Sequence, residues 1–359
     1  MIHAIEKFSR EFAPSHEILN LISEIDEFKG KWTALQNLSP DRLLALRRVA
    51  TIESVGSSTR IEGVKLSDRE VEVLLSNLTT YSFKSRDEEE VAGYAEAMGL
   101  VYESWRELEL TENHLKQLHS VLLKFSNKDA AHRGGYKKLS NNVAAFDADG
   151  KEIGIVFETA SPFETPLAME KLTDWLNRLL ENRTVHPLLT LAVFVVSLLA
   201  IHPFQDGNGR LSRIVTTLIL LRTGYEYVPY ISLESIIEDN KDSYYKALRE
   251  TQKTLRGGAG RDRADWEKWC LFFLKCLKKQ KDKLAVKLER ERILARELAP
   301  LASEIVGLLR EHESLSIAEI AALTRSNRNT LKVRLRELVR DSYVERFGQA
   351  RATVYRLKS

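Results

Sequence analysis

Cysteine is scarce in this sequence, with only Cys270 and Cys276 among 359 residues. The two stand six positions apart, at roughly helical spacing. That spacing excludes the usual zinc site and the usual redox pair. Because free cysteines are commonly buried, both are predicted to be packing thiols.

Long hydrophobic runs are also missing. The longest, LLTLAVFVVSLLAI at residues 188–201, has 14 residues and includes Thr190 and Ser197. A membrane-spanning helix needs roughly 20 apolar residues, so no membrane partner is expected. The N-terminal stretch MIHAIEKFSREFAP has scattered charges and no apolar core of a secretory signal. The simplest expectation is a cytoplasmic protein.

Glycine and proline are few, at 17 and 8 residues, whereas apolar residues make up 43% and charged residues 29% of the sequence. This composition excludes collagen-like and disordered chains and suits a helical globular protein. The length favours two or three packed units. The formal net charge of +3 is nearly neutral, so any surface for nucleic acid must be local.

The hydrophobic pattern divides the chain into four parts. Residues 1–110 are predicted to form an N-terminal helical region and residues 111–280 a helical core. The stretch from Lys275 to Arg296 is dense in charge with leucines at wide spacing, which we interpret as a solvated connecting helix, and the connection is placed at residues 281–300. Residues 301–359 are expected to form a separate small unit.

Local signals place individual elements. Helical spacing covers about residues 41–63, and Ser67 with Glu70 has the pattern of a capping box that begins the next helix. Residues 141–160 change character, because β-branched and aromatic residues flank a central Asp149-Gly150 pair. This pattern predicts a β-hairpin.

The stretch AIHPFQDGNGRLSR, residues 200–213, has the features of an anion site. An apolar helix leads into His202 and a new helix is expected to begin near Gly209, so a loop joins two buried helices. The amides of Gly207, Asn208 and Gly209 then lie at a helix N-terminus. Unpaired N–H groups and the positive end of the helix dipole favour an anion there.

The charged residues of this stretch fit phosphoryl chemistry. Arg210 and Arg213 are three apart on the first turn, so both can face one mouth and bind phosphate oxygens. Asp206 supplies the hard carboxylate that a magnesium ion on two phosphates needs. His202 is the titratable group suited to accept a proton near neutral pH. Together they indicate phosphoryl or nucleotidyl transfer to a hydroxyl.

The stretch HPFQDGNGRLSR resembles in full the signature of the Fic family, H-x-F-x-[D/E]-G-N-G-R-x-x-R. The likeness covers about residues 40–280. It includes VAAFDADGKEIGIVF, placed as a hairpin flap, and YISLESIIEDNKDSYYKAL at 230–248, which is similar to a downstream family segment. The resemblance implies a mainly α fold, with a Fic-type helical core and a small β-hairpin flap.

The resemblance also implies transfer of AMP from ATP to a Ser, Thr or Tyr hydroxyl of a target protein, the chain itself included. The flap would hold the target backbone by strand addition, which asks little of target sequence and leaves the target unidentified. The roles implied by position are His202 as general base, Phe204 as the anchor of the loop in the core, Asp206 as the Mg²⁺ ligand, Gly207, Asn208 and Gly209 as the anion cradle, Arg210 as a phosphate ligand and Arg213 as the ligand of the γ-phosphate.

Asn240, Tyr244 and Tyr245 belong to the downstream segment. They are candidates for the nucleotide side of the pocket, although packing alone would equally explain the tyrosines. Nothing in the sequence of the base pocket demands adenine, so another nucleotide or phosphate-containing donor stays open.

The segment SSTRIEG resembles the family's inhibitory motif, [S/T]-x-x-x-E-[G/N], with Ser58, Glu62 and Gly63 in register. It precedes the core, as in members that carry an N-terminal inhibitory helix. We expect Glu62 to pair with Arg213 and to take the place that the γ-phosphate requires. ATP would then bind only in a pose misaligned for attack. An ordinary helix end is the alternative interpretation.

Residues 301–359 have the element order of a winged helix-turn-helix. The unit carries 11 Lys and Arg against 7 Asp and Glu, a net of +4, whereas the other 300 residues carry 43 and 44. DNA is therefore one candidate partner, and protein, including a second copy of the chain, is the other. The residues expected to face outward from the third helix, toward a major groove, are Arg328, Asn329, Lys332 and Arg336.

Two further expectations concern the same unit. Val333, Leu335 and Leu338 are predicted to face its core. A wing at about residues 346–351 would contact the DNA backbone.

Two functional alternatives remain at this point. One is a transcription regulator whose Fic core senses a nucleotide, although sensing would not need His202. The other is the reverse reaction, in which Glu62 helps water to remove AMP from a target. A homodimer that occludes the site is compatible with the resemblance, but the sequence has no decisive interface feature.

Overall fold

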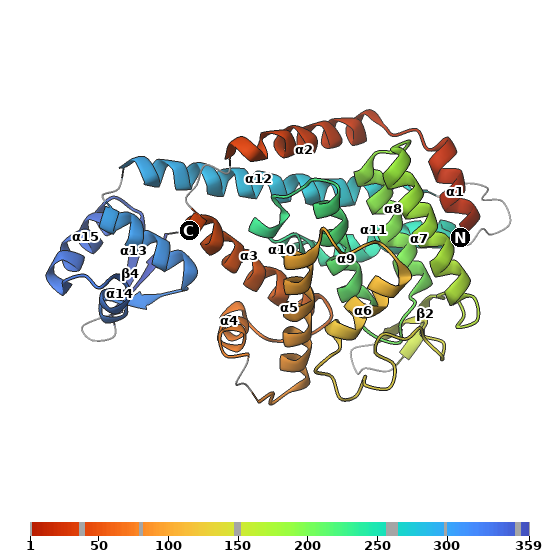
Figure 1. The fold of residues 1–359 in the computed structure, drawn as a ribbon, viewed down its shortest axis with the longest axis horizontal. Helices are drawn as coiled ribbons and strands as arrows, with labels where there is room; N and C mark the ends of the chain where they lie inside the picture. The colour runs from red at the N-terminus through yellow and green to blue at the C-terminus, as the bar shows by residue number, and fades with distance from the viewer. Residues whose placement is uncertain are drawn as a thin grey trace.

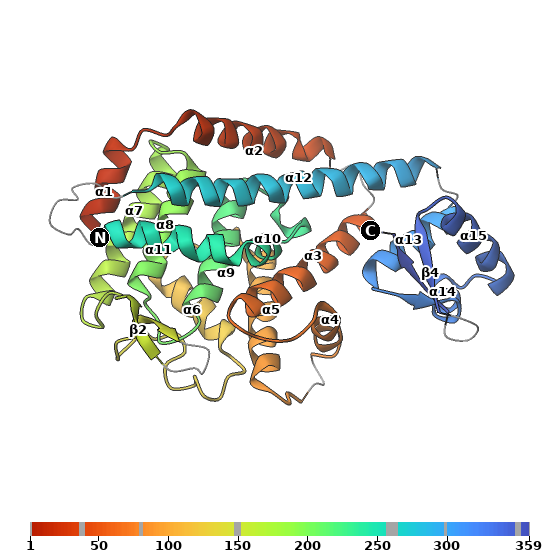
Figure 2. The same cartoon turned by 180° about the vertical axis from the view of Figure 1, so that it is seen from behind.

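The computed structural model describes residues 2–35, 40–78, 82–146, 152–255, 265–297, 300–348 and 353–358. Helices dominate these residues and the strands are short, so the predicted mainly α fold is confirmed. Figures 1 and 2 show a large helical body with a smaller C-terminal unit at one end. None of the described helices combines the length and the apolarity that a membrane crossing requires.

The N-terminal part contributes α1 (Ile2–Glu11), α2 (His16–Leu35), α3 (Pro40–Ile61) and α4 (Asp68–Ser76). The segment predicted as an inhibitory helix is α3, which ends one residue before Glu62. Gly63 follows with a φ of 107°, a backbone angle that glycine adopts without strain, and turns the chain. The predicted capping box of Ser67 and Glu70 begins α4.

The central part is built around two buried helices. Every residue from 188 to 201 in α8 (Pro187–Ile201) is buried, as expected for a helix that is apolar on all sides. It packs against α9 (Asn208–Arg222), which is buried along most of its length. The surrounding helices are α5 (Arg86–Ser104), α6 (Glu112–Leu122), α7 (Thr165–Asn182), the 3₁₀ turn η1 (Val228–Tyr230), α10 (Glu234–Asp239) and α11 (Lys241–Leu255).

The predicted β-hairpin is present. Strand β1 (Val143–Phe146) pairs antiparallel with β2 (Glu152–Phe157). In this register Val143 lies opposite Phe157 and Phe146 opposite Glu152. The predicted Asp149-Gly150 turn falls outside the described residues.

The charged connecting helix is part of one long helix, α12 (Glu267–Glu297), and runs beside α2 (Figure 1). The prediction that it is solvated is wrong for the inner side of the helix. Leu284 and Leu288 are buried there, and Gln280 is buried with its side-chain amide donating to the Ile231 carbonyl. The widely spaced leucines are the contact stripe of a packed helix. Both cysteines lie buried in α12 as predicted, and burial raises the pKa of Cys276 to about 12.

The C-terminal unit has a hydrophobic core of its own. Its elements are α13 (Pro300–Glu311), β3 (Leu315–Ser316), α14 (Ile317–Thr324), α15 (Arg328–Arg340), β4 (Val344–Phe347) and β5 (Val354–Leu357). The strands form one antiparallel sheet in the order β3-β5-β4. The succession of three helices and two final strands along the chain agrees with the sequence analysis, which did not predict β3. The assignment as a winged helix-turn-helix stays a prediction. Residues 349–351 of the expected wing lie outside the described residues.

One core residue of this unit was predicted wrongly. Val333 is exposed, whereas Leu331, Leu335 and Leu338 are buried. Spacings of four and three keep those leucines on one face of α15. Val333 stands two positions from both Leu331 and Leu335, which turns it to the opposite face.

Candidate active site

The predicted anion loop lies between α8 and α9, and left-handed residues stand at both of its ends. His202 ends α8 with a φ of 54°, and Gly207 precedes α9 with a φ of 79°. A left-handed conformation is unfavourable for a residue with a Cβ, so the strain at His202 persists only because its surroundings hold it. The first turn of α9, with its unpaired N–H groups, opens directly after this loop.

The interior of the loop is tied to the core. Phe204 is fully buried, and its ring stacks on the ring of His119 at a centroid distance of 3.9 Å. The buried Asn208 side chain accepts from the Phe204 N–H at 2.9 Å and donates to the Phe204 carbonyl at 2.7 Å. The Asn208 amide is therefore used within the loop, which leaves the backbone N–H of this residue for an anion.

His119 is a supporting residue that the sequence analysis missed. Its Nδ1 accepts from the Gly134 N–H at 2.9 Å, so Nε2 carries the proton and donates to the Asp206 carbonyl at 3.0 Å. Burial lowers the pKa of His119 to about 4, which keeps the ring neutral. The only signal in the sequence is a lone histidine on the apolar face of a helix, a pattern more typical of packing.

His202 has the tautomer that a general base requires. Its Nδ1–H donates to the Leu199 carbonyl at 3.3 Å, which leaves Nε2 without a proton. Burial lowers the pKa of His202 to about 4, and the hydrogen bond to Leu199 offsets part of that effect. The ring is therefore neutral at pH 7 and can accept a proton.

The predicted inhibitory residues lie against Arg213, which is buried. The Arg213 guanidinium donates to the Ser58 hydroxyl at 2.7 Å, to the Ser58 carbonyl at 2.9 Å and to Glu62 Oε1 at 2.7 Å. Although burial opposes the charge, the Glu62 carboxylate raises the pKa of Arg213 above its ordinary value. Ser58 in α3 and Glu62, just beyond the end of α3, thus accept from these Arg213 donors.

The Glu62 carboxylate also lies over the start of α9. A Cβ placed on Gly209 would stand 2.1 Å from Glu62 Oε1, so any larger residue at this position would collide with the carboxylate. Oxygen atoms of Glu62 therefore fill space at the helix N-terminus, where oxygens of a bound anion are expected.

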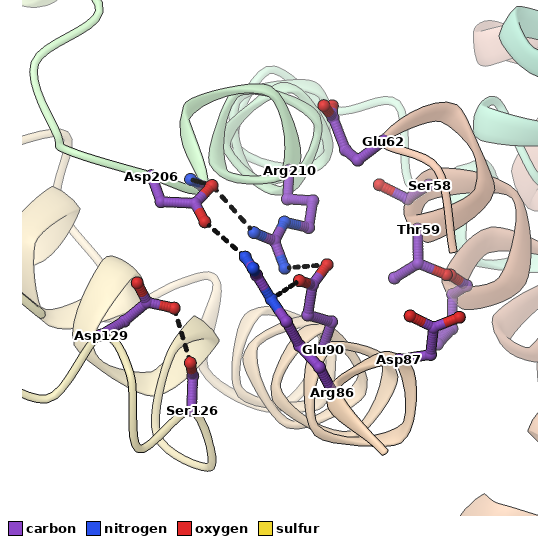
Figure 3. A network of polar contacts seen from close by, with 12 residues as sticks. Ser58, Thr59, Glu62, Arg86, Asp87, Glu90, Ser126, Asp129, Asp206 and Arg210 are labelled. Atoms are coloured by element: carbon purple, nitrogen blue, oxygen red, sulfur yellow. Dashed lines mark hydrogen bonds and ion pairs between the residues drawn. The ribbon is translucent and has the colours of Figure 1, made fainter. Parts of the chain in front are cut away.

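A ring of charges joins α5 to the anion loop (Figure 3). Arg86 contacts Asp206 Oδ2 at 2.9 Å and Glu90 Oε1 at 2.7 Å. Arg210 contacts Glu90 Oε2 at 2.8 Å and Asp206 Oδ1 at 3.3 Å. Although burial opposes the charge, Arg210 and the Gly207 N–H hold the pKa of Asp206 below its ordinary value. Arg86 and Glu90 were not predicted, because an i, i+4 charge pair is common on helix surfaces.

Arg210 retains one donor for a ligand. Its side chain is buried, and its Nε has no hydrogen-bond partner in the described part of the chain. Buried polar atoms without a partner are rare and call for a ligand or a water molecule. A phosphate oxygen at the N-terminus of α9 would satisfy this donor.

The carboxylate of Asp206 suits a divalent cation that is held mainly by phosphate oxygens and water. The described residues contain no cluster of three or more His, Cys, Asp or Glu side chains arranged for a metal, so ATP and water would supply most of the ligands beside Asp206. Its Oδ2 partner, Arg86, is 45% exposed and can turn toward solvent.

The downstream candidates lie in different surroundings. Asn240 ends α10 and donates to the Ile236 carbonyl at 2.7 Å. Tyr244 is buried in contact with the rings of Tyr245 and Trp269. The Tyr245 hydroxyl is 3.5 Å from the Ile61 carbonyl at the end of α3. The two tyrosines lie near the Arg213 and Glu62 pair, whereas Asn240 serves its own helix.

Comparison with known proteins shows which family the chain resembles. Residues 109–220 match the model of the Fic/DOC family. A protein adenylyltransferase Fic from Drosophila grimshawi is 28% identical over 251 residues, which cover 67% of this chain and 48% of that protein. The corresponding protein from Drosophila willistoni is 29% identical over 210 residues, covering 57% and 38%. The chain spans less than half the length of these two relatives.

Solved structures extend the likeness. A Fic family protein from Desulfovibrio desulfuricans G20 is 26% identical with a TM-score of 0.62, over 96% of this chain and 97% of that chain. A Fic domain containing signaling protein from Bacteroides thetaiotaomicron VPI-5482 is 26% identical with a TM-score of 0.59, over 74% and 97%. The resemblance to the Fic family predicted from the sequence is confirmed.

Proposed function

We propose that this chain is a self-inhibited protein adenylyltransferase that transfers AMP from ATP to a Ser, Thr or Tyr hydroxyl of a target protein. The observation that carries the proposal is the pairing of Glu62 with the buried Arg213 beside a helix N-terminus and a neutral histidine. The names of the curated relatives support the same activity.

In the proposed reaction His202 accepts the proton of the target hydroxyl at Nε2. The hydroxyl oxygen then bonds to the α-phosphorus of ATP, and the bond from that phosphorus to the bridging oxygen breaks. Pyrophosphate leaves with the electron pair, and AMP stays on the target. The N–H groups at the start of α9 and the free Nε donor of Arg210 stabilise the charge on the phosphate oxygens.

A magnesium ion would be held by Asp206 and by ATP itself. It would neutralise charge on the phosphates as pyrophosphate departs. Before it can bind there, the contact between Arg86 and Asp206 Oδ2 has to open. Arg86 can then keep its second partner, Glu90.

Inhibition follows from competition for one guanidinium. Glu62 and the γ-phosphate would both bind Arg213, and the Glu62 carboxylate also fills space next to Gly209. With Glu62 in place, ATP would bind without the γ-phosphate contact and with its α-phosphorus out of line. Release of Glu62 would restore the productive pose.

The test is AMP transfer by wild type, Glu62→Gly and Glu62→Gly/His202→Ala, each incubated with Mg²⁺ and ATP. Intact mass measures self-modification, and an ATP labelled on its α-phosphate reports proteins modified in a cell lysate. We expect labelling by Glu62→Gly to be at least tenfold above wild type and to vanish in the double variant. Equal labelling by Glu62→Gly and the double variant would contradict the role of His202, and no labelling by any variant would contradict adenylyl transfer.

The reverse reaction is a second candidate, favoured by the Glu62 carboxylate lying close enough to His202 to raise the pKa of its ring. A carboxylate there could orient water toward an AMP-bearing target. Wild type and Glu62→Gly would be compared for release of AMP from a target labelled beforehand. Faster release by wild type would support this direction, and equal rates would exclude it.

For the C-terminal unit we propose DNA as the partner. Arg328, Lys332 and Arg336 follow one another at spacings of four on the exposed face of α15. In the described part of the chain none of the three forms an ion pair with a carboxylate, whereas Arg334 pairs with Glu337. A row of unpaired cations on an exposed helix suits the phosphate backbone of DNA.

A further inference from the structure

Lys137 is a buried cation that none of the steps above uses. Its side chain lies in the interior, and its ammonium donates to Asn141 Oδ1 at 2.7 Å, to the Thr159 hydroxyl at 2.9 Å and to the Ile201 carbonyl at 3.0 Å. Its backbone N–H donates to the Pro203 carbonyl at 2.8 Å. One residue therefore holds the chain on both sides of His202.

Burial of a lysine is costly, and lysine is almost never found fully buried without partners. The location of the Lys137 ammonium offsets part of that cost. The Ile201 carbonyl belongs to the C-terminal end of α8, where the helix dipole concentrates negative potential. An apolar side chain of the same length would fill the space but could not neutralise this helix end.

Asn141 extends the contact across the loop. While Asn141 Oδ1 accepts from Lys137, its Nδ2 donates to the His202 carbonyl at 3.1 Å and to the Phe204 carbonyl at 2.6 Å. His202 has a left-handed backbone, which surrounding contacts must maintain. Lys137 and Asn141 together bind the carbonyls of residues 201, 202, 203 and 204.

The same cluster closes the base of the hairpin. Asn141 and Asn142 directly precede β1, and Thr159 stands two residues after the end of β2. The Thr159 hydroxyl donates to Asn141 Oδ1 at 2.9 Å, and its N–H donates to Asn142 Oδ1 at 3.0 Å. The two ends of the hairpin therefore meet at Lys137.

We propose that Lys137 is a positioning residue that clamps the base of the hairpin to the His202 loop. A hydroxyl on a target strand added to the hairpin is thereby delivered to His202 Nε2 in register. This inference rests on the proposed adenylyl transfer. It adds Lys137 as a residue that aligns the target hydroxyl with the general base. Lys137 acts through Asn141 and the backbone, without touching ATP.

The kinetic test uses the Glu62→Gly background, with Lys137→Met and Lys137→Arg compared. Met keeps the length without the charge, and Arg keeps charge and donors. Because small misplacement of reacting groups has a large effect on rate, we expect Lys137→Met to lower kcat about tenfold or more, with KM for ATP within twofold. Lys137→Arg should recover part of the loss. An unchanged kcat in Lys137→Met, or a kcat loss that Arg does not reduce, would overturn the proposal.

Two controls separate this claim from misfolding and from failure of the proposed function. Thr159→Val removes one hydroxyl without removing the charge, and should lower kcat in the same direction by less. The ring ¹⁵N signals of His202, identified by their loss in His202→Asn, report its position without any turnover. If Glu62→Gly transfers no AMP, the proposed function fails, while an unchanged His202 signal in folded Lys137→Met would separately overturn the clamp.

Discussion

Substitution of Glu62 should change the stability of the protein and its response to ATP in opposite directions. Breaking a buried ion pair typically costs about 3–5 kcal/mol. Glu62 is 32% exposed, however, and Arg213 keeps both of its bonds to Ser58 when Glu62 is removed. The expected loss for Glu62→Gly is therefore about 1–2 kcal/mol, the size of one hydrogen bond to a charged group, and about 1–3 °C in Tm.

ATP should compensate for this loss in the variant. A ligand at a hundred times its Kd stabilises the folded state by about 2.7 kcal/mol. In wild type the productive pose requires the Glu62–Arg213 pair to break first, so about 1–2 kcal/mol of that gain is lost. In Glu62→Gly the γ-phosphate meets an Arg213 that is already free of the carboxylate.

The assay is thermal unfolding of wild type and Glu62→Gly with and without ATP. The variant should have the lower Tm without ATP and the larger ATP-induced rise. Glu62→Gln serves as the control, because it keeps the volume and a hydrogen bond but loses the charge. Its Tm without ATP and its ATP-induced rise in Tm should lie between those of wild type and Glu62→Gly. Equal ATP-induced shifts in wild type and Glu62→Gly would refute the competition between Glu62 and the γ-phosphate.

Three other predictions concern separate parts of the molecule. Burial lowers the pKa of His202 to about 4, so the transfer rate should fall only as the pH approaches about 4. A fall in the rate centred near pH 6.5 would contradict a buried general base. Because this pKa lies below that of the unfolded chain, the contribution of His202 to stability should decrease as pH falls from about 6.5 to 4. Arg86→Gln frees Asp206 Oδ2 and should lower the Mg²⁺ concentration for half-maximal transfer; no change would deny competition at Asp206. Replacing Arg328, Lys332 and Arg336 together by glutamine should weaken DNA binding and reduce the slope of log affinity against log salt concentration by about 3. Unchanged binding would exclude this face of α15 as the DNA-binding surface.

The parts of the site that could be predicted are those whose conformation depends on residues adjacent in the sequence. The loop between two helices, the glycine before α9 and the position of Arg213 all follow from one stretch of about a dozen residues. The capping box at Ser67 and the hairpin around residues 141–160 are local in the same sense. In each case the chemistry of adjacent residues fixes the backbone conformation, so a single sequence is enough to predict the element.

The site residues that were not predicted from the sequence act on partners that are far away along the chain. Lys137 reaches a carbonyl 64 positions away, His119 one 87 positions away and Arg86 a carboxylate 120 positions away. Each has an ordinary local explanation, as a surface lysine, a packed histidine or a helix charge pair. The packing of α5 and α6 beside α9 gives Arg86 and His119 their roles, and the path of the chain past the end of α8 gives Lys137 its role. No local pattern records that packing.

The inhibitory contact can open without disturbing the helix that carries it. Glu62 stands beyond the end of α3, and Gly63 follows with a positive φ, so the carboxylate sits on a turn. Ser58, one turn earlier, separately holds α3 to Arg213. Rotation of one side chain therefore frees the guanidinium while α3 stays packed. The free-energy difference between the closed and open states is then about that of one charged hydrogen bond, which a bound nucleotide can overcome and which Glu62→Gly removes.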